Sequence, residues 1–274
     1  MKLIHTLAEL RTTLSAYRHP AVVPTMGNLH AGHIALVEAA KPLGDVTLAT
    51  VFVNRLQFGP NEDFDTYPRT LDADCAQLEA AGCDIVFAPT EKELYPQKQT
   101  FLIEPPSELA NILEGHFRPG FFTGVATVVM KLLSATQART AVFGKKDYQQ
   151  LMVIRQMVQQ FAMPVNIVGI DTRRSSEGLA LSSRNGYLSP AEREAAVLLS
   201  QTLKKIADAI RNGRSDYAAL EAEAMATLSA AGWKPDYVVA RRQVDLQAPQ
   251  PGDAMVVLAA ARLGTTRLID NLEV

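Results

Sequence analysis

The stretch that decides the fold runs from residue 22 to residue 36 and reads VVPTMGNLHAGHIAL. It begins as a short apolar strand, turns around Gly27, and opens a helix near Gly32 and His33. A strand, a glycine turn and a helix N-terminus together favour phosphate, because free backbone N–H groups and the helix dipole attract an anion. His30 and His33 lie on one face of this helix, where two imidazoles can stabilise charge on a phosphoryl group. The alternative is a packing unit with two ordinary surface histidines, since short motifs match by chance.

The composition is that of a globular protein and does not favour a macromolecular partner. The 274 residues are 47% apolar and carry a formal net charge of −2, so we infer no nucleic-acid partner and no membrane partner. No apolar run is long enough to span a bilayer and the N-terminus lacks a signal peptide, so we expect a cytoplasmic protein. Cys75 and Cys83 have neither metal-site nor redox spacing, which also fits a reducing compartment.

Strand-like and helix-like segments alternate over the first two thirds of the chain. Residues 46–54 are a near-continuous run of residues that favour β-structure, as in a strand buried on both faces of a parallel sheet. Further strands are predicted at 21–24, 85–88, 141–143 and 165–170, with 101–103 as an additional candidate. Helices are predicted at 3–17, 33–41, 71–81 with Thr70 as its cap, 124–135 and 147–161; residues 61–69 are a predicted loop. This alternation predicts a Rossmann-like, doubly wound parallel sheet in residues 1–171, with ligands beyond the carboxyl ends of the strands.

The composition changes near Gly186, where a smaller domain is predicted over residues 172–274. The sequence SPAE at 189–192 has an N-cap serine, proline at the first helical position and glutamate at the third. A helix should follow and end near 212–213, and a second should cover 216–230. Antiparallel strands are predicted at 237–241, 255–260 and 266–269, so this domain is of the α+β class.

Several stretches, taken together and in order, resemble the pantothenate synthetase family, which is the pantoate–β-alanine ligase branch of the HxGH nucleotidyl-transferring superfamily. They are PTMG and HAGH within 24–33, FVNRLQFG at 52–59, YPRT at 67–70, GVATVV at 124–129, FGKKDYQQ at 143–150 and GLALSSRN at 178–185. The resemblance implies that pantoate and ATP form a pantoyl adenylate and pyrophosphate, and that β-alanine then yields pantothenate and AMP. A carboxylate is a poor acylating agent, so it first needs a leaving group, and AMP serves as one.

The resemblance also implies roles for particular residues. His33 is the implied proton donor, whose protonated imidazole would stabilise the departing pyrophosphate. Gln57 and Gln150 are the implied pantoate ligands, although Gln150 alone would also suit a helix surface. The implied ATP-binding residues are Met26, Gly27, Asn28, Leu29, His30, Ala31, Gly32, His33, Gly144, Lys145, Lys146, Asp147, Arg173, Leu181, Ser182, Ser183 and Arg184. Residues 1–171 would then bind ATP and pantoate, and residues 172–274 would act as a lid. Ser182 and Ser183 are alternatively a flexible polar linker between the domains, and both interpretations can hold, because a phosphate clamp on a hinge closes with substrate.

Magnesium is expected with ATP, and it usually keeps several water ligands. Asp72, Asp74 and Gln77 are candidates for its surroundings, with an exposed helix face as the alternative, and no metal ligand is assigned. Family members are typically dimers through the N-terminal domain, so the resemblance implies a homodimer.

The chain departs from the family pattern at a few positions. Arg55 replaces a proline, Phe121 a histidine and Lys145 a glutamate, and Asp171 and Ser175 replace a proline and a glutamate. Three hypotheses follow: the ligase, a plain nucleotidyltransferase that stops after adenylyl transfer, and a nucleotide-binding protein with weak catalysis. The two glutamine ligands favour the ligase, because they suit a small polyhydroxy acid better than a phosphorylated acceptor.

Overall fold

The structure is a computed structural model that describes residues 1–60 and 62–274. The chain forms two compact units, one of residues 1–144 with 153–171, and one of residues 145–152 with 172–274. The functional domain boundary predicted after residue 171 stays a prediction. Within the described residues, no helix combines the length and the apolar character that crossing a bilayer requires.

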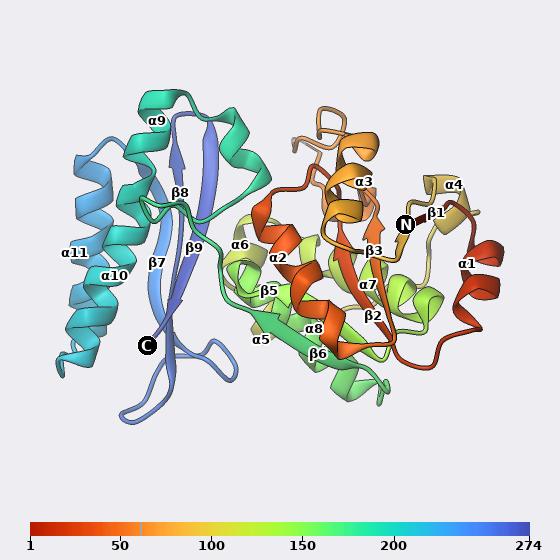
Figure 1. The fold of residues 1–274 in the computed structure, drawn as a ribbon. Helices are drawn as coiled ribbons and strands as arrows, with labels where there is room; N and C mark the ends of the chain where they lie inside the picture. Colours follow the sequence, from red (N-terminus) through yellow and green to blue (C-terminus); the bar gives the residue numbers. More distant parts are fainter. Residues whose placement is uncertain (61) are drawn as a thin grey trace. The chain divides into compact units, whose positions relative to one another are not determined.

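The first unit is built on a six-stranded parallel sheet in the order β1-β4-β3-β2-β5-β6 (Figure 1). Its strands are β1 Lys2–Ile4, β2 Pro20–Thr25, β3 Val46–Val51, β4 Ile85–Phe87, β5 Thr140–Gly144 and β6 Asn166–Ile170. The chain moves outward from β2 through β3 to β4, and then from β5 to β6 on the other side. The topological switch point therefore lies between β2 and β5, and the HxGH stretch follows β2 there. The predicted Rossmann-like, doubly wound class is confirmed.

Helices flank this sheet and bury its apolar side chains. They are α1 Leu7–Leu14, α2 Ala31–Ala40, α3 Leu71–Ala80, α4 Glu91–Leu94, α5 Ser107–Ala110, α6 Glu114–Phe117, α7 Phe121–Thr136 and α8 Tyr148–Gln160. Helix α2 packs on β2, β3 and β5, and α7 packs on β2 and on the 3₁₀ turn Arg55–Gln57. Gly124 allows this second contact, because a Cβ there would lie 2.2 Å from the Leu56 carbonyl oxygen.

The second unit contains a three-stranded antiparallel sheet of β7 Lys234–Arg242, β8 Met255–Leu263 and β9 Thr266–Glu273. Helices α10 Val197–Arg211 and α11 Tyr217–Ala230 pack on it (Figure 1) and bury Leu203, Leu228 and Trp233 in its core. The predicted capping box is present at α9 Pro190–Ala195, where Ser189 and Glu192 bond each other's backbone N–H. The α+β class is confirmed.

Several local predictions are wrong. Residues 2–4 form an edge strand paired with Ile85–Phe87, and the first helix begins only after Thr6, whose side chain caps it. Residues 101–103 form no strand, since the backbone N–H of Ile103 instead donates to the Thr127 hydroxyl at 3.0 Å. Thr70 does not cap α3 with its side chain. The predicted loop 61–69 is free of helix and strand from residue 62 onward, and Asn61 lies outside the described residues.

Candidate active site

The two histidines of the HxGH stretch cap the helix that follows β2. The Nδ1 atom of His30 accepts the backbone N–H of Gly32 at 3.0 Å, and Nδ1 of His33 accepts the backbone N–H of His30 at 3.3 Å. Their ring centroids lie 4.1 Å apart. Because Nδ1 is an acceptor in both rings, the neutral imidazoles carry their proton on Nε2, which is therefore a hydrogen-bond donor. An imidazolium would need its second proton on Nδ1, where the structure has the backbone bond.

A buried carboxylate holds the turn before this helix. Asp74 is only 1% exposed, and its two oxygens accept the backbone N–H groups of Asn28 at 3.0 Å and Leu29 at 2.8 Å. The Thr70 hydroxyl donates to the same carboxylate at 3.1 Å. Gly27 has φ +82°, and a Cβ there would lie 2.9 Å from Asp74 Oδ2, so glycine is required for two reasons.

These contacts correct two expectations about the same stretch. The N–H groups predicted to be free for a phosphate already have acceptors at Gly27, Asn28, Leu29, His30, Gly32 and His33. Besides the backbone groups in these contacts, the imidazole Nε2–H groups of His30 and His33 are donors that this turn can direct at an anion. Asp74 is not on an exposed helix face, and with these three donors on its oxygens it does not fit a magnesium ligand. Among the described residues, no group of three or more His, Cys, Asp or Glu side chains has the arrangement of a metal site.

A chain of hydrogen bonds fixes the amide of Gln57. Asn54 is fully buried, and its Nδ2 donates to the Gly124 carbonyl and to Gln57 Oε1, both at 3.1 Å. A carbonyl can only accept, so the Gly124 contact determines which end of the Asn54 amide is nitrogen. Gln57 therefore accepts with Oε1 and presents its NH₂ group, which lies 3.3 Å from Met26 Sδ. The structure thus brings together Met26 and Gln57, two residues predicted for the site.

Tyr95 completes this chain, and the sequence analysis missed it. Its hydroxyl donates to Asn54 Oδ1 at 2.9 Å, and Lys131 Nζ lies 4.4 Å from its ring centroid. Burial raises the pKa of Tyr95, so the hydroxyl remains a donor at neutral pH. Asn54 lies within the stretch 52–59 that carries the family resemblance, so the sequence could have identified it as a site residue. No local sequence pattern identifies Tyr95, because its hydrogen-bond partner Asn54 lies 41 residues away along the chain.

In the second unit, β9 holds the predicted ATP segment at the 3₁₀ turn Lys145–Asp147. Asn271 Nδ2 donates to the carbonyl oxygens of Lys145 at 2.9 Å and Lys146 at 2.7 Å. The Lys145 ammonium lies 2.8 Å from a Glu273 carboxylate oxygen, and the Tyr148 hydroxyl donates to the other oxygen at 3.1 Å. The lysine that replaces the family's glutamate is therefore part of a pair with Glu273.

The neighbouring residue of β9 anchors the other predicted ATP segment. Asp270 is 4% exposed and binds Arg174 through two parallel hydrogen bonds of 2.7 and 2.9 Å. The Leu181 N–H donates to the Arg173 carbonyl at 2.9 Å, and Ser182 Oγ accepts the Arg184 N–H at 3.3 Å. The structure thus orders each predicted segment of this unit through its own contacts. Convergence of the residues of both units on one triphosphate stays a prediction.

Two departures from the family pattern have partners near Gln57. The Phe121 ring lies under the guanidinium of Arg118, 3.6 Å from its Cζ. Arg118 also binds Glu62 at 2.6 Å and the Gln57 carbonyl at 3.2 Å. Arg55 stacks on Phe64 at 3.9 Å and pairs with Glu91 at 3.2 Å. Each replacement therefore packs against charged or aromatic neighbours within its own unit.

A doubly wound sheet with a histidine-capped helix at its switch point defines a nucleotide-binding α/β protein. Residues 2–273 match the family model described as pantoate-beta-alanine ligase. The chain belongs to the pantoate–β-alanine ligase family.

Known proteins resemble this chain over its whole length, which confirms the resemblance seen in the sequence. Pantothenate synthetases of Paracidovorax citrulli and Verminephrobacter eiseniae are 61% and 60% identical, with all of both chains covered in each case. A crystal structure of pantothenate synthetase from Thermus thermophilus is 42% identical, with a TM-score of 0.95 over 100% of this chain and 99% of that one. The ligase of Francisella tularensis, crystallised with beta-gamma ATP and beta-alanine, is 36% identical, with a TM-score of 0.81 over 100% and 97%.

The Asp74 carboxylate should be necessary for the turn before α2. Asp74→Asn replaces one acceptor oxygen with an NH₂ group, so a backbone N–H of Asn28 or Leu29 loses its partner. We expect a loss of about 2 kcal/mol in unfolding free energy and faster hydrogen exchange at these two amides. Urea denaturation and exchange measured by NMR test this. Asp72→Asn, on the exposed side of α3, is the matched control, and equal exchange in both variants would contradict the role of Asp74.

Proposed function

We propose that this ligase activates pantoate with ATP as a pantoyl adenylate and then transfers the pantoyl group to β-alanine. The contact between Met26 and Gln57 carries the proposal, because it joins the nucleotide stretch after β2 to the residue implied to hold pantoate after β3. The relative crystallised with an ATP analogue and β-alanine supports the same pair of substrates. A plain nucleotidyltransferase would have no use for an amide fixed in this way.

The proposed reaction has two steps. A pantoate carboxylate oxygen attacks the α-phosphorus of ATP, a P–O bond forms, and the bond to pyrophosphate breaks. The amine of β-alanine then attacks the activated carbonyl, loses a proton, and expels AMP as the amide forms. Nε2–H groups of His30 and His33 would donate to phosphoryl oxygens on which charge develops during the first step. His33 is the proposed catalytic residue.

Gln57 would orient pantoate through its NH₂ group, which suits a carboxylate or hydroxyl oxygen. Gln150, which is half-buried on α8, is the second proposed pantoate ligand. We propose that Lys146, Ser182, Ser183 and Arg184 bind ATP phosphates and that Asp147 binds the ribose. Support for these roles comes from the family pattern and from the ordered turns that carry the residues.

Magnesium, the homodimer and the cytoplasmic location are proposals of the same kind. Magnesium would enter with ATP and be held by phosphate oxygens and water, because no described carboxylate set fits it. The two cysteines are unpaired in the structure, as in proteins of reducing compartments.

Substrate-dependent release of AMP tests the proposed function. In a coupled assay, AMP should appear only when ATP, pantoate and β-alanine are all present, and one amide should form for each AMP. Pyrophosphate formation without amide product would support the nucleotidyltransferase instead. Binding of ATP without turnover would support a nucleotide-binding protein with weak catalysis.

Two substitutions of His33 distinguish the structural role of its Nδ1 atom from the catalytic role proposed for its Nε2–H group. The Asn side chain in His33→Asn can still accept the His30 N–H as Nδ1 does, but it lacks a donor at the Nε2 position. We expect kcat to fall about 100-fold or more, with a thermal midpoint close to that of the unchanged protein. His33→Ala should lose turnover equally and also lose stability. His116→Ala, at an exposed histidine, is the control, and near-normal turnover of His33→Asn would exclude His33 from the chemistry.

Tyr95 should act as a positioning residue for pantoate. Tyr95→Phe leaves Asn54 Oδ1 without its donor, so the Asn54 and Gln57 amides lose their fixed orientation. We expect about a tenfold rise in KM for pantoate, equivalent to one hydrogen bond, with KM for ATP unchanged. Adding Gln57→Ala to this variant should have less effect than Gln57→Ala alone has on the unchanged protein. Equal changes in KM for pantoate and KM for ATP would contradict the positioning role of Tyr95. Tyr217→Phe, in the second unit, is the control.

A further inference from the structure

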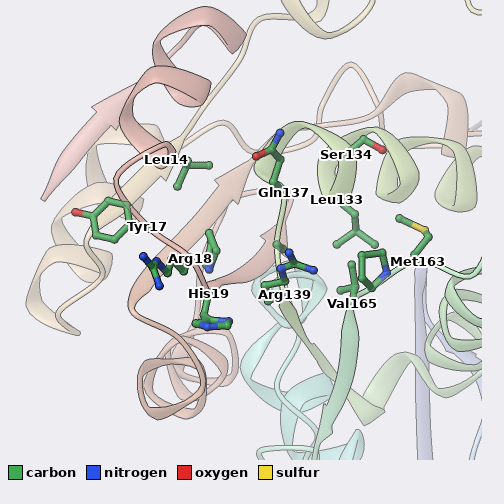
Figure 2. A pocket seen from close by; sticks show the side chains of 13 residues that line it. Leu14, Tyr17, Arg18, His19, Leu133, Ser134, Gln137, Arg139, Met163 and Val165 are labelled. Atoms are coloured by element: carbon green, nitrogen blue, oxygen red, sulfur yellow. The ribbon is translucent and has the colours of Figure 1, made fainter.

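A cavity of about 670 Å³ opens on the first unit at the edge of the sheet where the parallel strands begin. Its lining comes from the residues before β2, from the end of α7 and the residues after it, and from the residues before β6 (Figure 2). The HxGH stretch follows the other end of β2. Since β2 has six residues, about 20 Å of strand separates the two places. One small molecule cannot reach both.

Two arginine side chains line this cavity beside His19. Arg18, His19 and Arg139 lie in the middle of the view in Figure 2, and no Asp or Glu is among the lining residues. In the part of the chain that the structure describes, neither the Arg18 nor the Arg139 guanidinium makes a hydrogen bond or an ion pair. In contrast, Arg118 and Arg174 each bind a carboxylate through two hydrogen bonds. Both arginines are solvent-exposed, and two guanidinium groups on one concave surface can bind an anion through bidentate hydrogen bonds.

The nearby carboxylate of Asp45 does not neutralise these arginines. Its oxygens accept the backbone N–H groups of Arg18 at 2.7 Å and His19 at 2.9 Å, and the Arg18 contact helps to hold the pKa of Asp45 below its usual value. The carboxylate thus fixes the backbone that carries both side chains. Against two full positive charges stand the single charge of Asp45 and the partial negative charge, about half a unit, at the C-terminal end of α7.

The rest of the lining is largely apolar. Leu133, Met163 and Val165 lie on one side of the basic residues in Figure 2, and the Tyr17 ring lies on the other. The volume falls within the range of small-molecule sites, about 300 to 1,000 Å³. A cavity with cations at its centre and apolar walls suits a ligand with an anionic group and an apolar or aromatic part.

We propose that this cavity is a second ligand site, which binds a small phosphate monoester through Arg18 and Arg139 and packs its organic part against Met163 and Val165. Phosphate monoesters fit better than monocarboxylates, because two guanidinium groups match a dianion with three acceptor oxygens. The site is separate from the proposed catalytic residues, so failure of either proposal leaves the other intact.

Methyl NMR on the full-length protein tests the site directly. Phenyl phosphate is the probe, inorganic phosphate carries the charge alone, and phenol carries the ring alone. We expect phenyl phosphate to shift the methyl signals of Leu133, Met163 and Val165 in a saturable way. Its dissociation constant should be at least tenfold lower than that of inorganic phosphate, and phenol should cause no shift. The methyl signal of Met26 reports any separate binding at the nucleotide stretch.

Charge-matched variants decide whether the arginines carry the binding. Arg18→Gln with Arg139→Gln should weaken phenyl phosphate at least tenfold, because both charge-assisted contacts are lost. Arg11→Gln with Arg262→Gln removes the same charge from exposed positions outside the cavity and should leave the affinity within twofold. Equal affinity in the two double variants, absence of shifts at the three methyl groups, or binding of inorganic phosphate as tight as that of phenyl phosphate would each overturn the proposal.

Discussion

The buried carboxylate of Asp74 sets the geometry at the switch point of the sheet. Gly27 and Asn28 both have positive φ, a conformation that costs free energy unless the surroundings fix it. Asp74 supplies that constraint with two acceptor oxygens, and the Thr70 hydroxyl holds the carboxylate in turn. The turn is therefore satisfied by its own chain, and it needs no ligand to adopt its shape. Preorganisation of this kind reduces the reorganisation that a reaction would otherwise require.

The same principle extends to the residues on either side of the turn. The Nδ1 atoms of His30 and His33 are used for capping, which fixes the tautomer and the direction of each Nε2–H. The Asn54 amide is fixed by Gly124 and Tyr95, and this determines that Gln57 accepts with Oε1 and presents its NH₂ group. In both cases a contact with a backbone group ultimately determines which atom of a side chain is the donor: directly for the two histidines, and through Asn54 for Gln57. Donors suit phosphate and carboxylate, the anions that the proposed reaction brings together.

The sequence predicts the fold better than it predicts the contacts that complete the site. The period of the apolar residues is sufficient for β2, β3 and the three strands of the second unit. It fails at residues 2–4, because a three-residue edge strand with two exposed side chains is too short to differ from a helix start. The acidic positions of α3 look exposed in sequence, yet Asp74 faces inward, since its acceptors are needed by a turn 45 residues away. Tyr95 and Glu273 have partners at 41 and 128 residues, a separation at which no local pattern gives a signal.

The placement of residues 145–152 in the second unit has a consequence for the way the chain is divided. The chain passes from one unit to the other after residue 144, returns after residue 152, and leaves again after residue 171. A fragment that stops at residue 171 would retain the carbonyl groups of Lys145 and Lys146 but not the Asn271 amide that binds them. The two units are thus interleaved along the polypeptide. A cut at residue 171 would leave the N-terminal fragment with a lysine turn that lacks its Asn271 contacts, and the C-terminal fragment with a β9 that lacks this turn.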